Sequence, residues 1–237
     1  MLIINEENAF VKQKRTKRKI HSRRQDEQER KCANFSRDLL TGETVSDMLC
    51  PTAWEGRNTD MRLLITIDGP CASGKTTLAE KLAKILQAQV LHTDDFVIPH
   101  AQKTAARLAE PGGNCDIERL MNEVVVPWKE GKDVRYRRYD CRNDRMREEE
   151  KLPPARALIL EGSYCNLPPI REKADLRIFL NTPPEIREAR LKERESPESL
   201  TRFHEKWIPL ENAYFEAFSL PDPGCLVIDY SVNSAVE

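Results

Sequence analysis

One glycine-containing segment limits the folds open to this chain more than any other feature of its sequence. Gly69-Pro-Cys-Ala-Ser-Gly-Lys-Thr-Thr77 matches the pattern G-x-x-x-x-G-K-[ST] at every fixed position. It follows the apolar run Met61–Ile67, which has the length of a buried strand, and leads into Lys75–Leu86, where apolar residues recur on one helical face. A strand, a glycine turn and an amphipathic helix in this order predict a phosphate-binding loop rather than a simple connecting turn.

The residue types in this segment suit the chemistry of a bound triphosphate. A glycine loop can wrap backbone N–H groups around phosphate oxygens, while the helix that follows points its positive end at the same anion. Lys75 is predicted to neutralise the β- and γ-phosphates of ATP, and the Thr76 hydroxyl is predicted to ligate Mg²⁺. The residues assigned to the nucleotide are Gly69, Ala72, Ser73, Gly74, Lys75, Thr76 and Thr77.

From Met61 onward, strand-like apolar runs alternate with amphipathic segments, the order expected of an α/β domain. The candidate strands are Leu63–Ile67, Gln89–His92, Ala157–Leu160, Leu176–Leu180 and Cys225–Ile228. We therefore predict that residues 61–237 form a P-loop NTPase three-layer fold. It would have a mainly parallel five-stranded sheet flanked by helices and a small helical lid.

Residues 1–60 differ from the rest of the chain. Lysine and arginine dominate Val11–Arg24, large apolar side chains are scarce up to Lys31, and residues 32–60 show no sustained period. We predict a disordered or partly helical tail and linker. The basic run fits a solvated tail or, less well, an arm that binds nucleic acid or directs nuclear import.

The composition of the chain limits the partners that it is expected to bind and the compartment in which it is expected to lie. A net charge of -1 gives no global field that would draw the domain to nucleic acid or to an anionic membrane. No apolar run reaches the roughly 18 residues that a membrane span needs. Glu6 and Glu7 precede the basic run, the reverse of a secretory signal, and the seven cysteines form no Cys-x-x-Cys pair. A cytoplasmic location with reduced thiols is the expectation.

Carboxylates follow two of the predicted strands at the edge where open α/β sheets bind their ligands. The second strand runs into Thr93-Asp94-Asp95-Phe96, and the strand Ala157–Leu160 runs into Glu161. Transfer of a phosphoryl group to an alcohol needs a proton acceptor and metal ligands. We assign Asp94 as the catalytic base and a metal ligand, and Glu161 as a second metal ligand; the alternative for Asp94 is a helix cap.

A basic helix is predicted after the strand Leu176–Leu180. Thr182-Pro-Pro-Glu185 has the form of a capping box with proline at the first helical position. The next helix is predicted to begin at Ser196-Pro197, to bend near Pro209 and to carry aromatic side chains that pack in the core.

Three arginines of the basic helix, Arg187, Arg190 and Arg194, share one helical face. They could close over the phosphates, with Arg190 and Arg194 stabilising the transferring group and Arg187 contacting substrate. Pairing with glutamates on an exposed helix is the equally weighted alternative.

Two segments are candidates for an acceptor pocket. If Val134–Asp140 is extended, Val134, Tyr136 and Arg138 lie on one side and Arg135, Arg137 and Tyr139 on the other. An aromatic ring beside cations suits a base or a sugar, but the same pattern suits an exposed edge strand. Asn114 and Asp116 follow a glycine pair and could bind acceptor hydroxyls or form a turn.

Together these motifs resemble the uridine kinase family of P-loop nucleoside kinases. The resemblance rests on the phosphate loop, Thr93-Asp-Asp-Phe96, Gly113-Asn-Cys-Asp116, Arg138-Tyr-Asp140 and Leu160-Glu-Gly162, in that order. It implies ATP-dependent transfer to a 5′-hydroxyl. It further implies that Asp94 is the catalytic aspartate, Asp116 a sugar-binding carboxylate and Tyr139 an acceptor-site aromatic, with Arg190 and Arg194 on the lid.

The resemblance departs from the family pattern after Asp140. The family carries Phe and then a base-reading His there, whereas this chain has Cys141, Asn143 and Asp144. We therefore expect an ATP- and Mg²⁺-dependent kinase for a nucleoside-like acceptor. The alternatives are a P-loop kinase for a nucleoside monophosphate, sugar acid or vitamin precursor, or a non-catalytic ATP-binding module whose basic tail binds nucleic acid.

Overall fold

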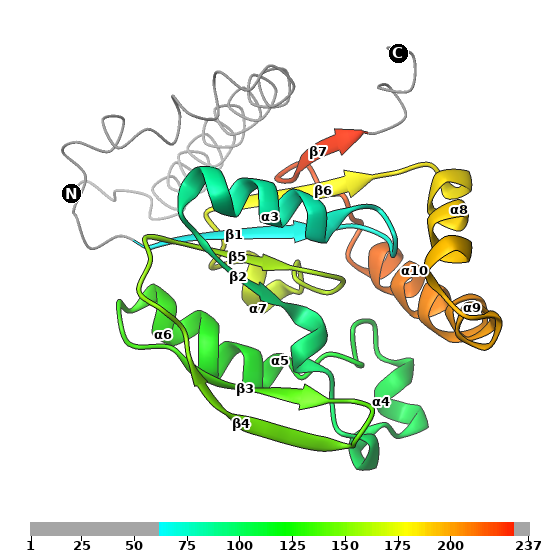
Figure 1. Ribbon diagram of the computed structural model, residues 1–237, viewed down its shortest axis with the longest axis horizontal. Coiled ribbons are helices and arrows are strands. Elements are labelled where there is room, and N and C mark those ends of the chain that lie inside the picture. Colours follow the sequence, from blue (N-terminus) through cyan, green and yellow to red (C-terminus); the bar gives the residue numbers. More distant parts are fainter. Residues whose placement is uncertain (1–61, 230–237) are drawn as a thin grey trace, which may run out of the picture.

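The computed structural model describes residues 62–229, and the predicted tail, residues 1–60, lies outside them. Their centre is a five-stranded sheet of order β2-β5-β1-β6-β7 in which every neighbouring pair is parallel (Figure 1). The strands are β1 (Leu63–Asp68), β2 (Gln89–His92), β5 (Ala157–Glu161), β6 (Leu176–Asn181) and β7 (Leu226–Asp229). The predicted parallel α/β sheet is confirmed.

Helices cover both faces of this sheet. The helical elements are α3 (Lys75–Leu86), α4 (Ala105–Ala109), α5 (Ile117–Leu120), α6 (Val126–Lys129), α7 (Pro168–Arg171), α8 (Pro184–Arg194), α9 (Pro197–Arg202) and α10 (Ile208–Ala217), with the 3₁₀ turns η2 (Thr93–Phe96) and η3 (His100–Gln102) and the π-helical segments η4 (Met121–Val125) and η5 (Phe203–Trp207). The two π-helical segments each lead into an α-helix with proline near its start.

The core consists of two apolar layers, one on each side of the sheet. Ile65 and Ile159 face α3, whereas Leu64 and Leu158 face the layer that contains Trp128 and Tyr214. This alternation follows from the period of two along a strand. Because strands buried on both faces need apolar residues throughout, they read in sequence as continuous apolar runs.

The carboxyl ends of the sheet strands point towards α8 and α10, which lie at that edge (Figure 1). The predicted start of α9 is confirmed, because the Ser196 hydroxyl accepts a hydrogen bond from the Ser199 N–H. The capping box predicted at Thr182 is wrong. The N-cap of α8 is Pro183, and the Thr182 hydroxyl instead donates to the Ser73 carbonyl of the glycine loop, 3.0 Å away.

A separate antiparallel hairpin lies outside the main sheet. It pairs β3 (Arg135–Asp140) with β4 (Arg145–Lys151), and the register shifts between Arg137 and Tyr139. Because of that shift, strict alternation fails: Tyr136 and Tyr139 are both buried, although they were predicted on opposite sides. Among residues 62–229, no helix is long and apolar enough to cross a membrane.

Candidate functional site

The glycine loop between β1 and α3 is the centre of the site. Gly69 has a φ of 140°, and a Cβ there would lie 2.5 Å from the carbonyl oxygen of Leu180 on β6. Gly74 has a φ of 101° and is the N-cap of α3. The Lys75 ammonium donates to the carbonyl oxygens of Gly69 and Pro70, at 2.8 and 3.0 Å, so it lies against the start of the loop. Loop and helix therefore have the arrangement that phosphate binding requires.

Four side chains outside the loop, one of them from the residue directly before it, hold the loop in place. Asp68 accepts from the Gly69 N–H at 2.7 Å, and Glu211 on α10 accepts from the Cys71 N–H at 2.9 Å. Thr182 binds the Ser73 carbonyl, and Arg190 donates to the Ala72 carbonyl at 3.0 Å. The helices α8 and α10 are thus hydrogen-bonded directly to the loop.

Glu161 connects β5 to the start of α3. Its carboxylate accepts a hydrogen bond from the Thr76 hydroxyl at 3.0 Å and lies 2.5 Å from the His92 ring nitrogen Nδ1. Glu161 is only 4% exposed. The hydrogen bond to Glu161 raises the pKa of His92, and this outweighs the opposing effect of partial burial.

Asp94 lies at the end of β2, in the turn η2. Although solvent reaches part of its side chain, the surrounding protein desolvates the carboxyl group, and this is the main reason that its pKa is raised. The charge of Lys75 opposes the increase, and the charges of Glu161 and Glu211 add to it. The structure therefore brings Asp94, Lys75 and Glu161 into one electrostatic environment.

The donor set at this position fits Mg²⁺. Mg²⁺ is commonly held by one or two carboxylates together with substrate phosphates and water. The Thr76 hydroxyl and the Glu161 carboxylate are already within 3.0 Å of each other, and the negative charge of Glu161 raises the pKa of Asp94. A divalent cation between these groups would relieve that repulsion. Among residues 62–229, no group of three or more His, Cys, Asp or Glu side chains forms a metal cluster.

The three arginines of α8 differ in their surroundings. Arg190 contacts the loop, and the Arg187 Nε donates to the Thr182 carbonyl at 3.0 Å, one residue before the prolines that begin the helix. Arg194 instead forms an ion pair with Glu195 at 2.8 Å and lies over the Phe203 ring. Arg187 and Arg190 thus lie beside the loop, whereas the structure shows no contact between Arg194 and the loop.

The residues predicted to bind the acceptor lie on α5 and the hairpin, next to η2. Asp116 is the N-cap of α5 and binds Arg119, so the turn expected at this point is present. A cavity of about 400 Å³ borders Asp116 and is lined by Ile98, Gln102, Arg107, Asp116 and Glu118. Asn114 is 8% exposed, and its side-chain oxygen has no hydrogen-bond partner.

The hydroxyl group of Tyr139 on β3 forms hydrogen bonds with other residues of the protein. The hydroxyl hydrogen-bonds to the Asp144 carboxylate and accepts from the His100 N–H, and the ring packs edge-on against His100. Asp144 therefore positions the aromatic residue that the resemblance assigns to the acceptor.

Sequence reasoning missed several residues that shape this site. Asp68, His92 and Glu211 received no role, although each contacts the loop or a candidate metal ligand. The position of Asp68 directly before the glycine loop was a usable signal. Nothing local in the sequence of α10 shows that Glu211 reaches Cys71, which lies 140 residues away.

Asp68 should make the stability of the protein depend on pH. It is fully buried, and desolvation raises its pKa from 3.8 to about 6, despite hydrogen bonds from Tyr214, Gly69 and Asn166. Because the folded state holds this proton more tightly than the unfolded state, the contribution of Asp68 to stability falls as pH rises from about 4 to above 6. We expect a loss of about 2 kcal/mol between pH 4 and pH 7.

Urea unfolding of the unmodified protein and of Asp68→Asn across this pH range measures the effect of Asp68. The difference in unfolding free energy between the two proteins should move in favour of the variant as pH rises, because Asn carries no proton that titrates here. A difference that stays constant with pH would contradict a raised pKa at Asp68.

Comparison with protein-family models identifies the family of this chain. The family model described as the phosphoribulokinase / uridine kinase family matches residues 64–198, more than half of the chain. A comparison with the curated proteins finds no relative by sequence.

Several solved structures share the fold. A possible uridine kinase from Bacillus stearothermophilus is 23% identical with a TM-score of 0.53, and the match covers 77% of this chain and 96% of that protein. A candidate fructose transport system kinase from Silicibacter sp. TM1040 is 25% identical with a TM-score of 0.56, covering 71% and 92%. D-glycerate 3-kinase from Cryptococcus neoformans is 13% identical with a TM-score of 0.50, covering 78% and 89%. With its phosphate loop, its strand-end carboxylates and its lid, this chain belongs to the phosphoribulokinase / uridine kinase family of P-loop kinases.

Proposed function

We propose that this protein transfers the γ-phosphoryl group of ATP, with Mg²⁺, to a hydroxyl group of a nucleoside-like acceptor. The observation that carries the proposal is that Lys75 and the Thr76–Glu161 pair lie beside the glycine loop, with Asp94 near enough for the charges of Lys75 and Glu161 to affect its pKa. A general base, a phosphate-binding ammonium group and metal ligands are the parts that phosphoryl transfer to an alcohol uses.

In the proposed reaction the acceptor oxygen forms a bond to the γ-phosphorus while the bond from that phosphorus to the β–γ bridging oxygen breaks. The hydroxyl proton passes to the Asp94 carboxylate, and ADP leaves. A raised pKa suits Asp94 to this role, because a base is most effective when its pKa is close to the working pH. Mg²⁺ held by Thr76 and Glu161, with Asp94 as a further ligand, would neutralise charge on the phosphates.

The lid contributes cations beside the phosphates. Arg190 already contacts the Ala72 carbonyl, and Arg187 lies one helical turn away on the same face of α8. Their guanidinium groups could rotate from these backbone carbonyls to the phosphate oxygens, which are stronger acceptors. Arg194 would need to leave Glu195 to do the same.

For the acceptor we propose contacts to Asp116 and Tyr139. Asp116 lines the cavity next to the site, and one carboxylate can accept more hydrogen bonds than those from Arg119. Hydroxyl groups of a ribose are suitable donors to it. The structural relatives include proteins whose names refer to uridine, fructose and glycerate, so the proposed family activity accommodates several alcohols.

A kinase for a different acceptor is the second candidate function. It is favoured by the segment after Asp140, where Asp144 binds Tyr139 and His100 instead of presenting a base-reading histidine. The acceptor is then a sugar acid, a nucleoside monophosphate or a vitamin precursor. Asp94 remains the catalytic base, and the glycine loop still binds ATP.

An ADP-release screen with purified protein, Mg²⁺ and ATP distinguishes these candidates. Nucleosides, nucleoside monophosphates, sugar acids and vitamin precursors are tested separately, and the product is identified by mass spectrometry. We expect the fastest turnover with a nucleoside and a product phosphorylated on a hydroxyl group. Turnover confined to another class would replace the nucleoside, and ATP binding without any turnover would favour a non-catalytic module.

We also propose a cytoplasmic enzyme that works without a membrane and whose core domain does not bind nucleic acid. The five cysteines of residues 62–229 are all free thiols, which is consistent with a reducing compartment. Fractionation of cells that produce the full chain would test the location.

A further inference from the structure

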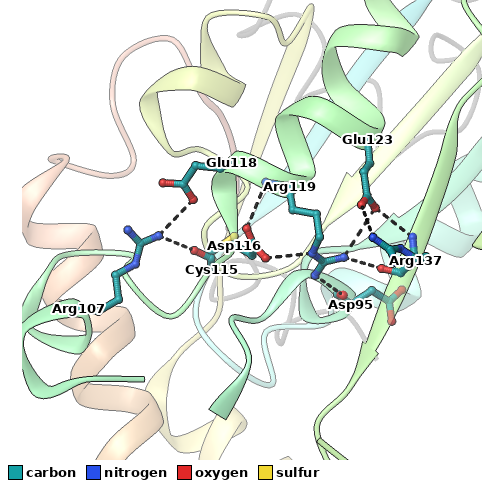
Figure 2. A network of polar contacts seen from close by, with 8 residues as sticks. All are labelled: Asp95, Arg107, Cys115, Asp116, Glu118, Arg119, Glu123 and Arg137. Atoms are coloured by element: carbon teal, nitrogen blue, oxygen red, sulfur yellow. Dashed lines mark hydrogen bonds and ion pairs between the residues drawn. The ribbon is translucent and has the colours of Figure 1, made fainter. Parts of the chain in front are cut away.

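Arg119 lies at the centre of the polar network in Figure 2. The side chain is only 10% exposed, and it lies on α5, away from the glycine loop. Its Nε donates to the Asp116 carboxylate at 3.0 Å, and its Nη2 donates to the Asp95 carbonyl at 3.1 Å. One guanidinium group therefore joins a proposed acceptor-binding carboxylate to the residue that follows Asp94.

The same guanidinium group also reaches the hairpin. Its Nη1 donates to the Arg137 carbonyl at 2.5 Å, and Glu123 lies 3.8 Å from the same nitrogen. Arg137 marks the start of the register shift in β3 that leads to Tyr139. Arg119 thus connects three separate pieces of chain: the turn η2, the start of α5 and the irregular part of β3.

Packing fixes the plane of this group. The guanidinium carbon lies 4.6 Å from the centre of the Phe96 ring, and Phe96 is fully buried. Arginine can stack its planar cation on an aromatic ring and donate several directed hydrogen bonds at the same time, whereas lysine cannot.

We propose that Arg119 is a positioning residue for phosphoryl transfer. It sets the distance between the Asp94 turn and the acceptor contacts Asp116 and Tyr139. This inference rests on the proposed kinase function, because Asp94, Asp116 and Tyr139 take their roles from it. Arg119 is not among the side chains that line the cavity beside Asp116. Its effect is on geometry, and a displacement of about 1 Å between reacting groups can cost roughly 100-fold in rate.

Arg119→Lys is the variant that tests the role, since it keeps the charge. A lysine can still pair with Asp116, but its single ammonium group does not span the Asp95 and Arg137 carbonyls together. Arg177→Lys is the matched control. Arg177 is 16% exposed and binds both oxygens of Asp222, and it lies near the amino end of β6, at the opposite edge of the sheet.

The first measurement is hydrogen exchange of the ligand-free proteins. We expect Arg119→Lys to speed exchange roughly 10-fold in residues 93–97 and 136–140, because both segments lose a hydrogen-bonded anchor. Arg177→Lys should leave these segments unchanged. Faster exchange confined to α5, or equal changes in both variants, would overturn the proposal.

The second measurement is turnover of uridine with Mg²⁺ and ATP. Arg119→Lys should lower kcat roughly 10- to 100-fold, leave the KM for ATP within about twofold, and melt close to the unmodified protein. A kcat within twofold of the unmodified value would overturn the proposal. If the unmodified protein does not phosphorylate uridine, uridine is not its acceptor, and the exchange measurement still decides the role of Arg119.

If Arg119→Lys does not melt cooperatively, a milder variant takes its place in the exchange measurement. Glu123 accepts from the Arg137 N–H at 3.0 Å and supports the same link to β3. Glu123→Ala removes this acceptor and should speed exchange in residues 136–140 but not in residues 93–97, because the Asp95 contact remains. No change in residues 136–140 would remove the hairpin from the inferred role.

Discussion

Replacing Asp94 by Asn is expected to lower turnover by roughly 10²- to 10⁴-fold while ATP binding changes little. An amide does not accept the hydroxyl proton, and general-base catalysis commonly contributes a factor of this size. The loop that would bind ATP is held by hydrogen bonds to Asp68, Glu211 and Thr182, and Asp94 takes part in none of these bonds. Coupled ADP release gives the turnover, and calorimetry with ATP gives the affinity.

Asp95→Asn is the control for this substitution. Asp95 is adjacent in sequence and also has a pKa raised by burial, but its carboxylate faces Arg138 at 3.7 Å instead of Lys75. We expect a loss of less than about tenfold. Equal losses in both variants would mean that the turn η2 has been disturbed as a whole, and unchanged turnover in Asp94→Asn would remove Asp94 from the mechanism.

The pH dependence of turnover gives a second check on Asp94. A base must be ionised, so kcat should fall as pH is lowered through the pKa of Asp94, which burial and Glu161 raise above its ordinary value. This acidic limb should disappear from the residual turnover of Asp94→Asn. A limb at the same pH in both proteins would assign it to another group, such as His92.

The main sheet was predictable from sequence for a physical reason. Buried parallel strands need apolar residues on both faces, so each appears as an apolar run, and every predicted strand lies within one residue of the observed bounds. The helix Lys75–Leu86 was predicted at its observed bounds, because a glycine turn and an amphipathic period mark it.

The hairpin could not be predicted in the same way. The strand β4 reads Arg-Met-Arg-Glu-Glu-Glu-Lys and has no apolar period, because most of its side chains are exposed. It is stabilised by pairing with β3, including an ion pair between Arg135 and Glu149 at 3.0 Å. The pairing of β3 with β4 depends on contacts between two strands, and the sequence of β4 alone does not reveal it.

The candidate site was predictable where its residues follow a strand or a glycine loop. Asp94 and Glu161 stand at strand ends, and the parallel sheet brings them to one edge. Arg119 gave only one sequence signal, its spacing of three from Asp116 on a helix. That spacing predicts the ion pair but not the contacts to Asp95 and Arg137, which depend on how three separate segments pack.

The second large effect is expected at Gly69, where Ala should destabilise the fold and abolish ATP binding. A Cβ at this position would meet the Leu180 backbone, with its oxygen at 2.5 Å and its nitrogen at 3.2 Å. Both atoms belong to β6, which is paired on both sides with β1 and β7, so they have little freedom to move. The φ of 140° adds strain for any residue with a side chain. We expect a loss of about 3 kcal/mol or more in unfolding free energy.

Gly131→Ala separates the cost of a positive φ from the cost of the clash between a Cβ and the β6 backbone. Gly131 also has a positive φ, 74°, but a Cβ there would meet nothing within 4 Å. It should cost only about 1 kcal/mol, and ATP should still bind. Urea unfolding of both variants, with and without Mg²⁺ and ATP, measures the loss of stability and the binding of ATP in one experiment. The nucleotide should stabilise Gly131→Ala as it stabilises the unmodified protein but leave Gly69→Ala unchanged. If ATP stabilises both variants equally, the close approach of Gly69 to β6 is not what shapes the phosphate loop.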